Sequence, residues 1–144
     1  MSTSDTERAV GYLVKRVQQS VRRQCDAALR PSGISMAQYA AMRALSDHPE
    51  ASASELARLC FVTRQSLQDL LAGLRSAGFV RNAKAPPRGR ARSLELTPTG
   101  TARLRAAHTA VMAVESRMLE GISANAQRQL SASLDRCAHN LEAD

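Results

Sequence analysis

The chain has 144 residues, enough for a single domain over residues 1–144 with its own hydrophobic core. Its apolar runs are shorter than the roughly 18 residues that cross a bilayer, and its N-terminus lacks the apolar stretch of a signal peptide, so we expect a cytoplasmic protein with no membrane partner. The three cysteines, which form no Cys-x-x-Cys pair, argue against a disulfide framework and a structural metal site.

The formal net charge of +7 is concentrated in one segment of the chain. Residues 58–92 hold eight basic residues and a single acidic one, Asp69, whereas the rest of the chain holds twelve of each sign. Such a local excess is typical of a surface that neutralises DNA phosphates. A solvated basic face is the alternative, and the motifs inside the segment decide between the two.

The N-terminal part of the chain predicts two helices. From about residue 7 to Leu29, apolar residues recur at steps of three and four, which is the pattern of one long amphipathic helix. Residues 31–33, Pro-Ser-Gly, end that helix. Ser35 with Gln38 forms a capping-box pattern that opens a second helix through Leu45.

Two shorter helices are predicted next. Ser52 with Glu55 repeats the capping-box pattern and opens a short third helix, in which we expect three residues to be buried: Leu56, Leu59 and Cys60. Thr63 is a candidate N-cap for a fourth helix that runs to about Ser76 and stops at Gly78. Its inward residues are expected to be Leu67, Leu70, Leu71 and Leu74.

The period then changes to that of a β-hairpin. Residues 79–84 and 92–97 predict two strands, joined by a basic turn over residues 85–91. Thr97 and Pro98 open a long helix with an apolar stripe, and Ser123 caps a last helix. The stripe of the last helix comprises Leu130, Leu134, Cys137, Ala138 and Leu141.

Two short helices joined by a tight link and followed by a basic hairpin predict a winged helix-turn-helix, a mainly α fold with a small β-hairpin wing. We place this lobe at residues 35–97 and expect the long helices over residues 7–30 and 98–141 to form a dimer. The fourth helix presents polar side chains from its first turns, as a helix that reads the major groove must. The candidate DNA-binding residues are Thr63, Arg64, Gln65, Ser66, Gln68, Arg81, Lys84, Arg88, Arg90 and Arg92.

The chain resembles the multiple-antibiotic-resistance regulator (MarR) family of winged helix-turn-helix transcriptional regulators. The resemblance is carried by residues 54–58 (SELAR), 62–67 (VTRQSL) and 74–81 (LRSAGFVR), and by Arg90 ahead of the Leu96-Thr97 pair. It covers nearly the whole chain. It implies an intertwined homodimer that acts on double-stranded DNA, most often as a repressor. It also implies that a small aromatic or lipophilic effector relieves the repression.

Three positions depart from the pattern of that family. Arg88 replaces the Asp that usually precedes the wing arginine, which favours phosphate contact by the wing as a whole over minor-groove insertion by Arg90. Cys60 stands where an aliphatic core residue is usual, and Phe61 where a small turn residue is common. We expect both to serve in packing.

The effector site is not located by the sequence. The candidates for effector binding lie on helices that would border a cavity between the dimer helices and the DNA-binding lobe. Each of them also suits a core or surface position. They are Tyr12, Arg16, Tyr39, Met42 and Arg43.

Cysteine-based oxidant sensing is an alternative mode of regulation. Cys25 and Cys137 are its candidates, yet both lie on apolar helix stripes, where a free Cys is commonly an inert small hydrophobe. A nucleoid-type protein of low sequence preference and a protein-interaction module remain alternatives for the lobe. The three histidines show no metal-ligand spacing, and no nucleophile-base pattern or phosphate loop appears, so we expect neither an enzyme nor a cofactor or metal.

Overall fold

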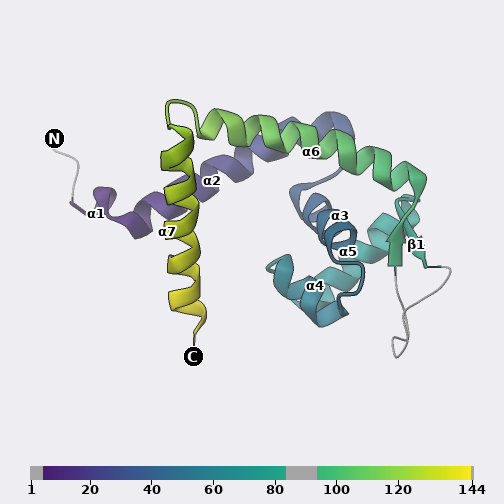
Figure 1. Cartoon of the computed structure of the whole chain (residues 1–144). Helices are drawn as coiled ribbons and strands as arrows, with labels where there is room; N and C mark the ends of the chain where they lie inside the picture. Colours follow the sequence, from purple (N-terminus) through teal and green to yellow (C-terminus); the bar gives the residue numbers. More distant parts are fainter. Residues whose placement is uncertain (1–4, 84–93, 144) are drawn as a thin grey trace. The chain divides into compact units, whose positions relative to one another are not determined.

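The computed structural model describes residues 5–83 and 94–143 of the chain (Figure 1). In chain order the elements are α1 (Asp5–Arg8), α2 (Val10–Leu29), the 3-10 helix η1 (Arg30–Ser32), α3 (Met36–Asp47), α4 (Ala53–Leu59), α5 (Arg64–Ser76), β1 (Val80–Asn82), β2 (Leu94–Leu96), α6 (Pro98–Met118) and α7 (Ala124–Glu142). They form two compact units, one up to Val114 and the other from Glu115 onward.

The predicted N-terminal helix is divided at Ala9, whose ψ of 143° is extended. The prediction of one continuous helix from residue 7 is therefore wrong at this point. No residue of α1 is buried, so no tertiary packing offsets the entropic cost of a continuous helix there. Gly11, just beyond the break, lowers the helical propensity further.

The helix starts predicted at Ser35 and Ser52 are confirmed by their hydrogen bonds. The Ser35 hydroxyl accepts from the backbone N–H of Gln38 at 3.0 Å, and the Ser52 hydroxyl accepts from that of Glu55 at 3.1 Å. In each case the side chain three residues on also accepts from the backbone of the cap, which completes the capping box. These bonds satisfy backbone donors that the first turn of a helix leaves without partners.

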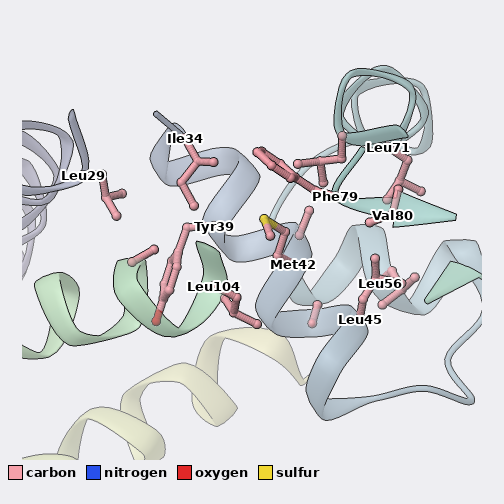
Figure 2. Packing of buried hydrophobic residues seen from close by; sticks show 14 of the residues in the cluster. Leu29, Ile34, Tyr39, Met42, Leu45, Leu56, Leu71, Phe79, Val80 and Leu104 are labelled. Atoms are coloured by element: carbon pink, nitrogen blue, oxygen red, sulfur yellow. The ribbon is translucent and has the colours of Figure 1, made fainter. Parts of the chain in front are cut away.

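The hydrophobic core of the first unit draws on α2, α3, α4, α5, β1 and α6. Leu29, Met42 and Val80 are almost completely buried, and Leu104 joins them from α6 (Figure 2). Burial of each such side chain contributes about 1.5–3 kcal/mol. The core therefore holds the three helices of the lobe and the start of the hairpin as one body.

Two leucines that we expected inside are not fully buried. Leu59 keeps 41% of its surface exposed, because it lies roughly 110° around α4 from the middle of the buried Leu56–Ala57 stripe. Leu70 is half-buried at the edge of the α5 stripe, which consists of Leu67, Leu71 and Leu74. The expectation of a buried Leu59 is wrong, and that for Leu70 holds only in part.

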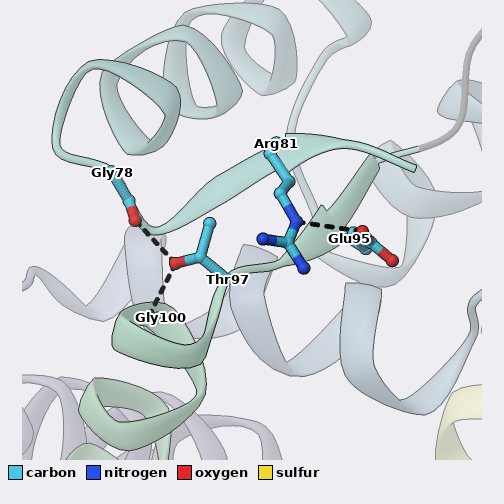
Figure 3. Close-up of polar contacts among 5 residues, drawn as sticks. All are labelled: Gly78, Arg81, Glu95, Thr97 and Gly100. Atoms are coloured by element: carbon cyan, nitrogen blue, oxygen red, sulfur yellow. Dashed lines mark hydrogen bonds and ion pairs between the residues drawn. The ribbon is translucent and has the colours of Figure 1, made fainter. Parts of the chain in front are cut away.

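The hairpin is antiparallel, with Arg81 opposite Glu95 and Val80 opposite Leu96. Its described strands are shorter than the predicted segments 79–84 and 92–97, and the predicted tip lies outside the described residues. Thr97 fastens the base of the hairpin: its hydroxyl donates to the Gly78 carbonyl oxygen at 2.6 Å and accepts from the Gly100 N–H at 3.0 Å (Figure 3). Thr97 thus caps α6, as predicted.

The second unit contains the end of α6 and the whole of α7. Ser123 caps α7 by accepting from the Ala126 N–H at 3.1 Å. No described residue of α7 is buried, and its apolar stripe, including Leu134 and Cys137, is open. Over the described part of the chain, no helix has the length and apolar character needed to cross a membrane.

Candidate nucleic-acid interface

The turn between α4 and α5 fixes where α5 begins. The backbone N–H of Phe61 donates to the Arg58 carbonyl at 3.1 Å, and that of Val62 donates to the Ala57 carbonyl at 3.0 Å. Thr63 then caps α5, accepting from the Ser66 N–H at 3.0 Å. Hydrogen bonds to α4 or α5 therefore hold each of the three residues of the turn, so the first turn of α5 starts from a defined position.

The two faces of α5 differ sharply. Leu67 is 1% exposed and Leu74 is completely buried, whereas the polar residues of the first two turns are on the outside. The exposed candidates for DNA contact on this helix are Arg64, Gln65, Ser66 and Gln68. The helix thus presents one guanidinium, two amides and a hydroxyl in a single polar surface.

Two of these side chains already make local hydrogen bonds. Thr63 Oγ1 donates to Ser66 Oγ at 3.0 Å, and Gln65 Nε2 donates to Asp69 Oδ1 at 3.2 Å. Asp69 had no role predicted from the sequence, although the four-residue spacing from Gln65 on a helix would have indicated the pair. Asp69 thus orients the Gln65 amide and also places a negative charge on this surface.

The described part of the hairpin brings one candidate, Arg81, into an ion pair. Arg81 Nε lies 3.0 Å from Glu95 Oε1 across the two strands, with both side chains nearly half exposed (Figure 3). Arg75 Nη2 donates to Asn82 Oδ1 at 2.9 Å and so links the end of α5 to β1. Glu95 was missed because it lies just beyond the basic segment. The other hairpin candidates, Lys84, Arg88, Arg90 and Arg92, lie outside the described residues.

Phe61 is placed differently from our expectation. Its side chain is 91% exposed and its φ is +58°, whereas we expected it to pack. The left-handed backbone turns the side chain away from the core, which Val62 approaches instead. Cys60 packs against the core as expected but is only half-buried, so the prediction that it is buried holds only in part.

The five effector candidates are split between core and surface. Tyr39 and Met42 are buried in the core, whereas Tyr12 and Arg16 are exposed on α2. Arg43 is partly exposed and pairs with Asp47 one turn away at 3.3 Å. Within one chain, the described structure does not gather these five side chains at one surface.

A polar contact links α3 to α6. The hydroxyl of Tyr39 lies 2.9 Å from Nδ1 of His108, and the two rings are nearly parallel, with an angle of 13° between them. His108 is half-buried. The contact joins the lobe to the long helix that follows the hairpin.

The three thiols differ in exposure. Cys25 is fully buried, and burial, with a smaller effect of the neighbouring Asp26 charge, raises the pKa of its thiol. Burial also raises the pKa of the Cys60 thiol. Both shifts favour the protonated form, which is a poor nucleophile, and so weigh against oxidant sensing at these two positions. Cys137 is exposed on α7.

Comparison with known proteins agrees with this architecture. The MarR family model matches residues 32–91, which contain α3, α4, α5 and β1. The HTH-type transcriptional repressor Rv2887 of Mycobacterium tuberculosis is 34% identical over 127 residues, covering 88% of this chain and 91% of that protein.

Solved structures of the same mycobacterial protein superimpose on this chain. Its complex with DNA gives a TM-score of 0.71 at 33% identity, covering 90% of this chain and 97% of that one. Its complex with salicylic acid gives a TM-score of 0.72 at 33% identity, covering 90% and 96%. The chain has a winged helix-turn-helix, and most of its length is similar to these proteins in sequence and fold. This similarity shows that the chain belongs to the MarR family.

Proposed function

We propose that the protein is a DNA-binding transcriptional repressor that acts in the cytoplasm as a homodimer on a pseudo-palindromic operator and is released by a small aromatic effector. The observation that carries the proposal is the surface of α5. Its first turns expose Arg64, Gln65 and Gln68 while Leu67 anchors the opposite face in the core. Such a helix can enter the major groove without disturbing its own packing.

The chemistry of these side chains suits base recognition. The Arg64 guanidinium matches the O6 and N7 acceptors of guanine, and a glutamine amide matches the N6 and N7 pair of adenine. Because Asp69 already holds the amide of Gln65, we expect Gln68 to be the freer of the two to select a base. In the dimer, two such helices would enter successive major grooves about 34 Å apart.

Phosphate contacts would supply the remaining affinity. Arg58 and Arg75 are exposed on α4 and α5. The arginines that the sequence predicts in the wing would add further positive charge. Their contacts fix the register of the protein on the duplex but do not read its sequence.

The first test is selection of the operator. Duplexes of about 30 base pairs with a randomised centre, roughly three helical turns, are enriched on the full-length protein. We expect a pseudo-palindrome that binds at least about a thousandfold more tightly than random duplex at the same salt concentration. A ratio near one would overturn the proposal in favour of low-specificity coating of DNA.

The second test locates the reading surface. The double variant Arg64→Ala/Gln68→Ala should lose about two orders of magnitude in affinity for the selected operator and little for random duplex, since each base contact is worth about 1–3 kcal/mol. Arg105→Ala, which removes one exposed arginine of α6, is the control matched for lost charge. If the double variant keeps the operator affinity, α5 is not the reading helix and a protein-interaction role gains support.

The effector is tested with salicylic acid, because a relative has been crystallised with it. An effector that binds the DNA-incompetent arrangement of the dimer more tightly shifts the population toward it. We therefore expect salicylic acid to raise the dissociation constant of the operator complex. An unchanged constant would contradict release by this aromatic acid and leave the DNA-binding part of the proposal standing.

A further inference from the structure

Phe61 presents a large apolar side chain to solvent at the entrance to α5. Among the exposed hydrophobic residues described, it has the highest exposure, 91%. It lies between α4 and α5, two residues before the Thr63 cap. Within its own chain, then, the ring gains almost nothing from burial.

The backbone, rather than side-chain packing, sets the direction of this ring. A φ of +58° is unfavourable for a residue with a Cβ, and glycine would adopt it freely. The hydrogen bonds of the Phe61 and Val62 N–H groups to the carbonyls of α4 hold the turn on both sides. The ring is therefore held outward before any partner binds.

The charge around Phe61 identifies the kind of partner. Arg58 and Arg64 lie three residues to either side, both exposed, and no acidic residue occurs between Glu55 and Asp69. A surface of this sign attracts a polyanion. Duplex DNA is a polyanion that also carries apolar groups, namely the thymine C5-methyl in the major groove and the C–H face of deoxyribose.

We infer that the Phe61 ring packs against the apolar surface of the operator, on a thymine methyl group or on the neighbouring deoxyribose. The inference rests on the proposed function and adds to it an apolar contact that is neither ionic nor a hydrogen bond, and that reads sequence only when it is made to the thymine methyl group. It also accounts for an aromatic residue at a left-handed position, because the ring reaches its partner from that backbone geometry.

The experiment uses full-length protein, the selected operator and three variants. Phe61→Gly removes the ring and suits the positive φ, and Phe61→Asn keeps a polar side chain that tolerates it. Phe61→Leu keeps apolar surface and is the matched control. We expect the Gly and Asn variants to bind the operator about tenfold more weakly, Leu to stay within about threefold of wild type, and the unfolding temperature of the Gly variant not to fall.

Salt dependence and modified DNA sharpen the result. Because the contact releases no counterions, the slope of log K against log salt should stay unchanged in the Gly and Asn variants, whereas Arg58→Ala, which removes a proposed phosphate contact, should reduce it. If the ring contacts the thymine methyl group, replacing thymine by uracil should weaken operator binding by the wild-type protein but not by Phe61→Gly. If the ring contacts deoxyribose, the replacement should leave the affinity of both proteins unchanged.

Wild-type affinity in all three variants would overturn the inference. Equal weakening in all three, including Leu, would also overturn it, because the loss would then follow the turn and not the apolar surface. Failure of the proposed function is distinguishable, since it would appear in the wild-type protein as the absence of any operator preference.

Discussion

Gly100 marks a place where the chain tolerates no side chain. A Cβ there would collide with the carbonyl oxygen of Phe79, the same oxygen that accepts the backbone N–H of Thr97 at 3.0 Å. Because backbone and not a flexible side chain is the obstacle, the base of the hairpin and the first turn of α6 would have to separate. Gly100 is thus required by close approach and not by a turn.

We predict that Gly100→Ala lowers the free energy of unfolding by about 2 kcal/mol or more, as overpacking does. Gly73→Ala is the control: it lies within α5, where a methyl group would meet open space, so alanine should raise stability by about 0.5–1 kcal/mol. Denaturant unfolding followed by circular dichroism measures both. Equal stability of the two variants would contradict the close approach.

Burial or exposure of a single residue decides whether its side chain can react with a solute or contact a partner molecule. Cys25 is enclosed with a thiol that is harder to ionise, whereas Phe61 is open on a left-handed turn. Both are apolar in character and sit in or next to helices. Composition therefore does not distinguish them, and the difference arises from the direction in which the backbone points each side chain.

At the scale of elements, the hairpin carries an ion pair that bears on both its stability and its attraction to DNA. Arg81 faces Glu95 directly across the strands, so part of its positive charge is compensated in the free protein. An exposed pair of this kind contributes at most about 1 kcal/mol to stability. We therefore expect the carboxylate to affect DNA binding more than folding.

We predict that Glu95→Gln strengthens operator binding by about two- to fivefold and steepens the salt slope by up to about one unit per protomer, because Arg81 becomes available to a phosphate. Stability should change by less than about 1 kcal/mol. Fluorescence anisotropy over a salt series measures the slope, with Glu120→Gln, a residue outside the hairpin segment, as a charge-matched control. Weaker binding in Glu95→Gln would show that the ion pair positions the wing.

At the scale of the whole molecule, long apolar stripes are open to solvent in a single chain. Val14 and Val17 of α2 and Leu130 and Leu134 of α7 are all partly exposed. The end of α6 and α7 also border an open groove of about 600 Å³, lined by apolar residues such as Met118 and Leu134 and by polar ones such as Glu115 and Arg128. A second copy of the chain would cover such stripes in the homodimer that we propose.

Leu134→Glu should convert the dimer to monomer and lower operator affinity at least about a hundredfold, because a buried charge without a partner is costly and a monomer engages one half-site. Ala132→Glu adds the same charge on the opposite side of α7 and should remain dimeric. Light scattering after size-exclusion chromatography gives the mass of each. A dimeric Leu134→Glu variant would place the interface elsewhere.

Much of the fold could be predicted because its signals are local. A cap such as Ser35, Ser52, Thr63 or Ser123 bonds a backbone N–H three residues away, so the hydroxyl and its target are visible together in the sequence. The outward face of α5 was predicted from its helical period in the same way. The break at Ala9 carried no comparable signal, because alanine is the best helix former.

Local signals thus specified the order of the main helices, the starts of the capped ones, and the polar face with Arg64 and Gln68, since these depend on residues within one or two turns of each other. Contacts between distant residues set the rest: Arg81 with Glu95, the Phe79 carbonyl against Gly100, and Tyr39 with His108. Neither the compensated charge of Arg81 nor the outward ring of Phe61 could be read from a pattern. Both follow from how the folded backbone directs side chains that lie far apart in sequence or at a turn without periodicity.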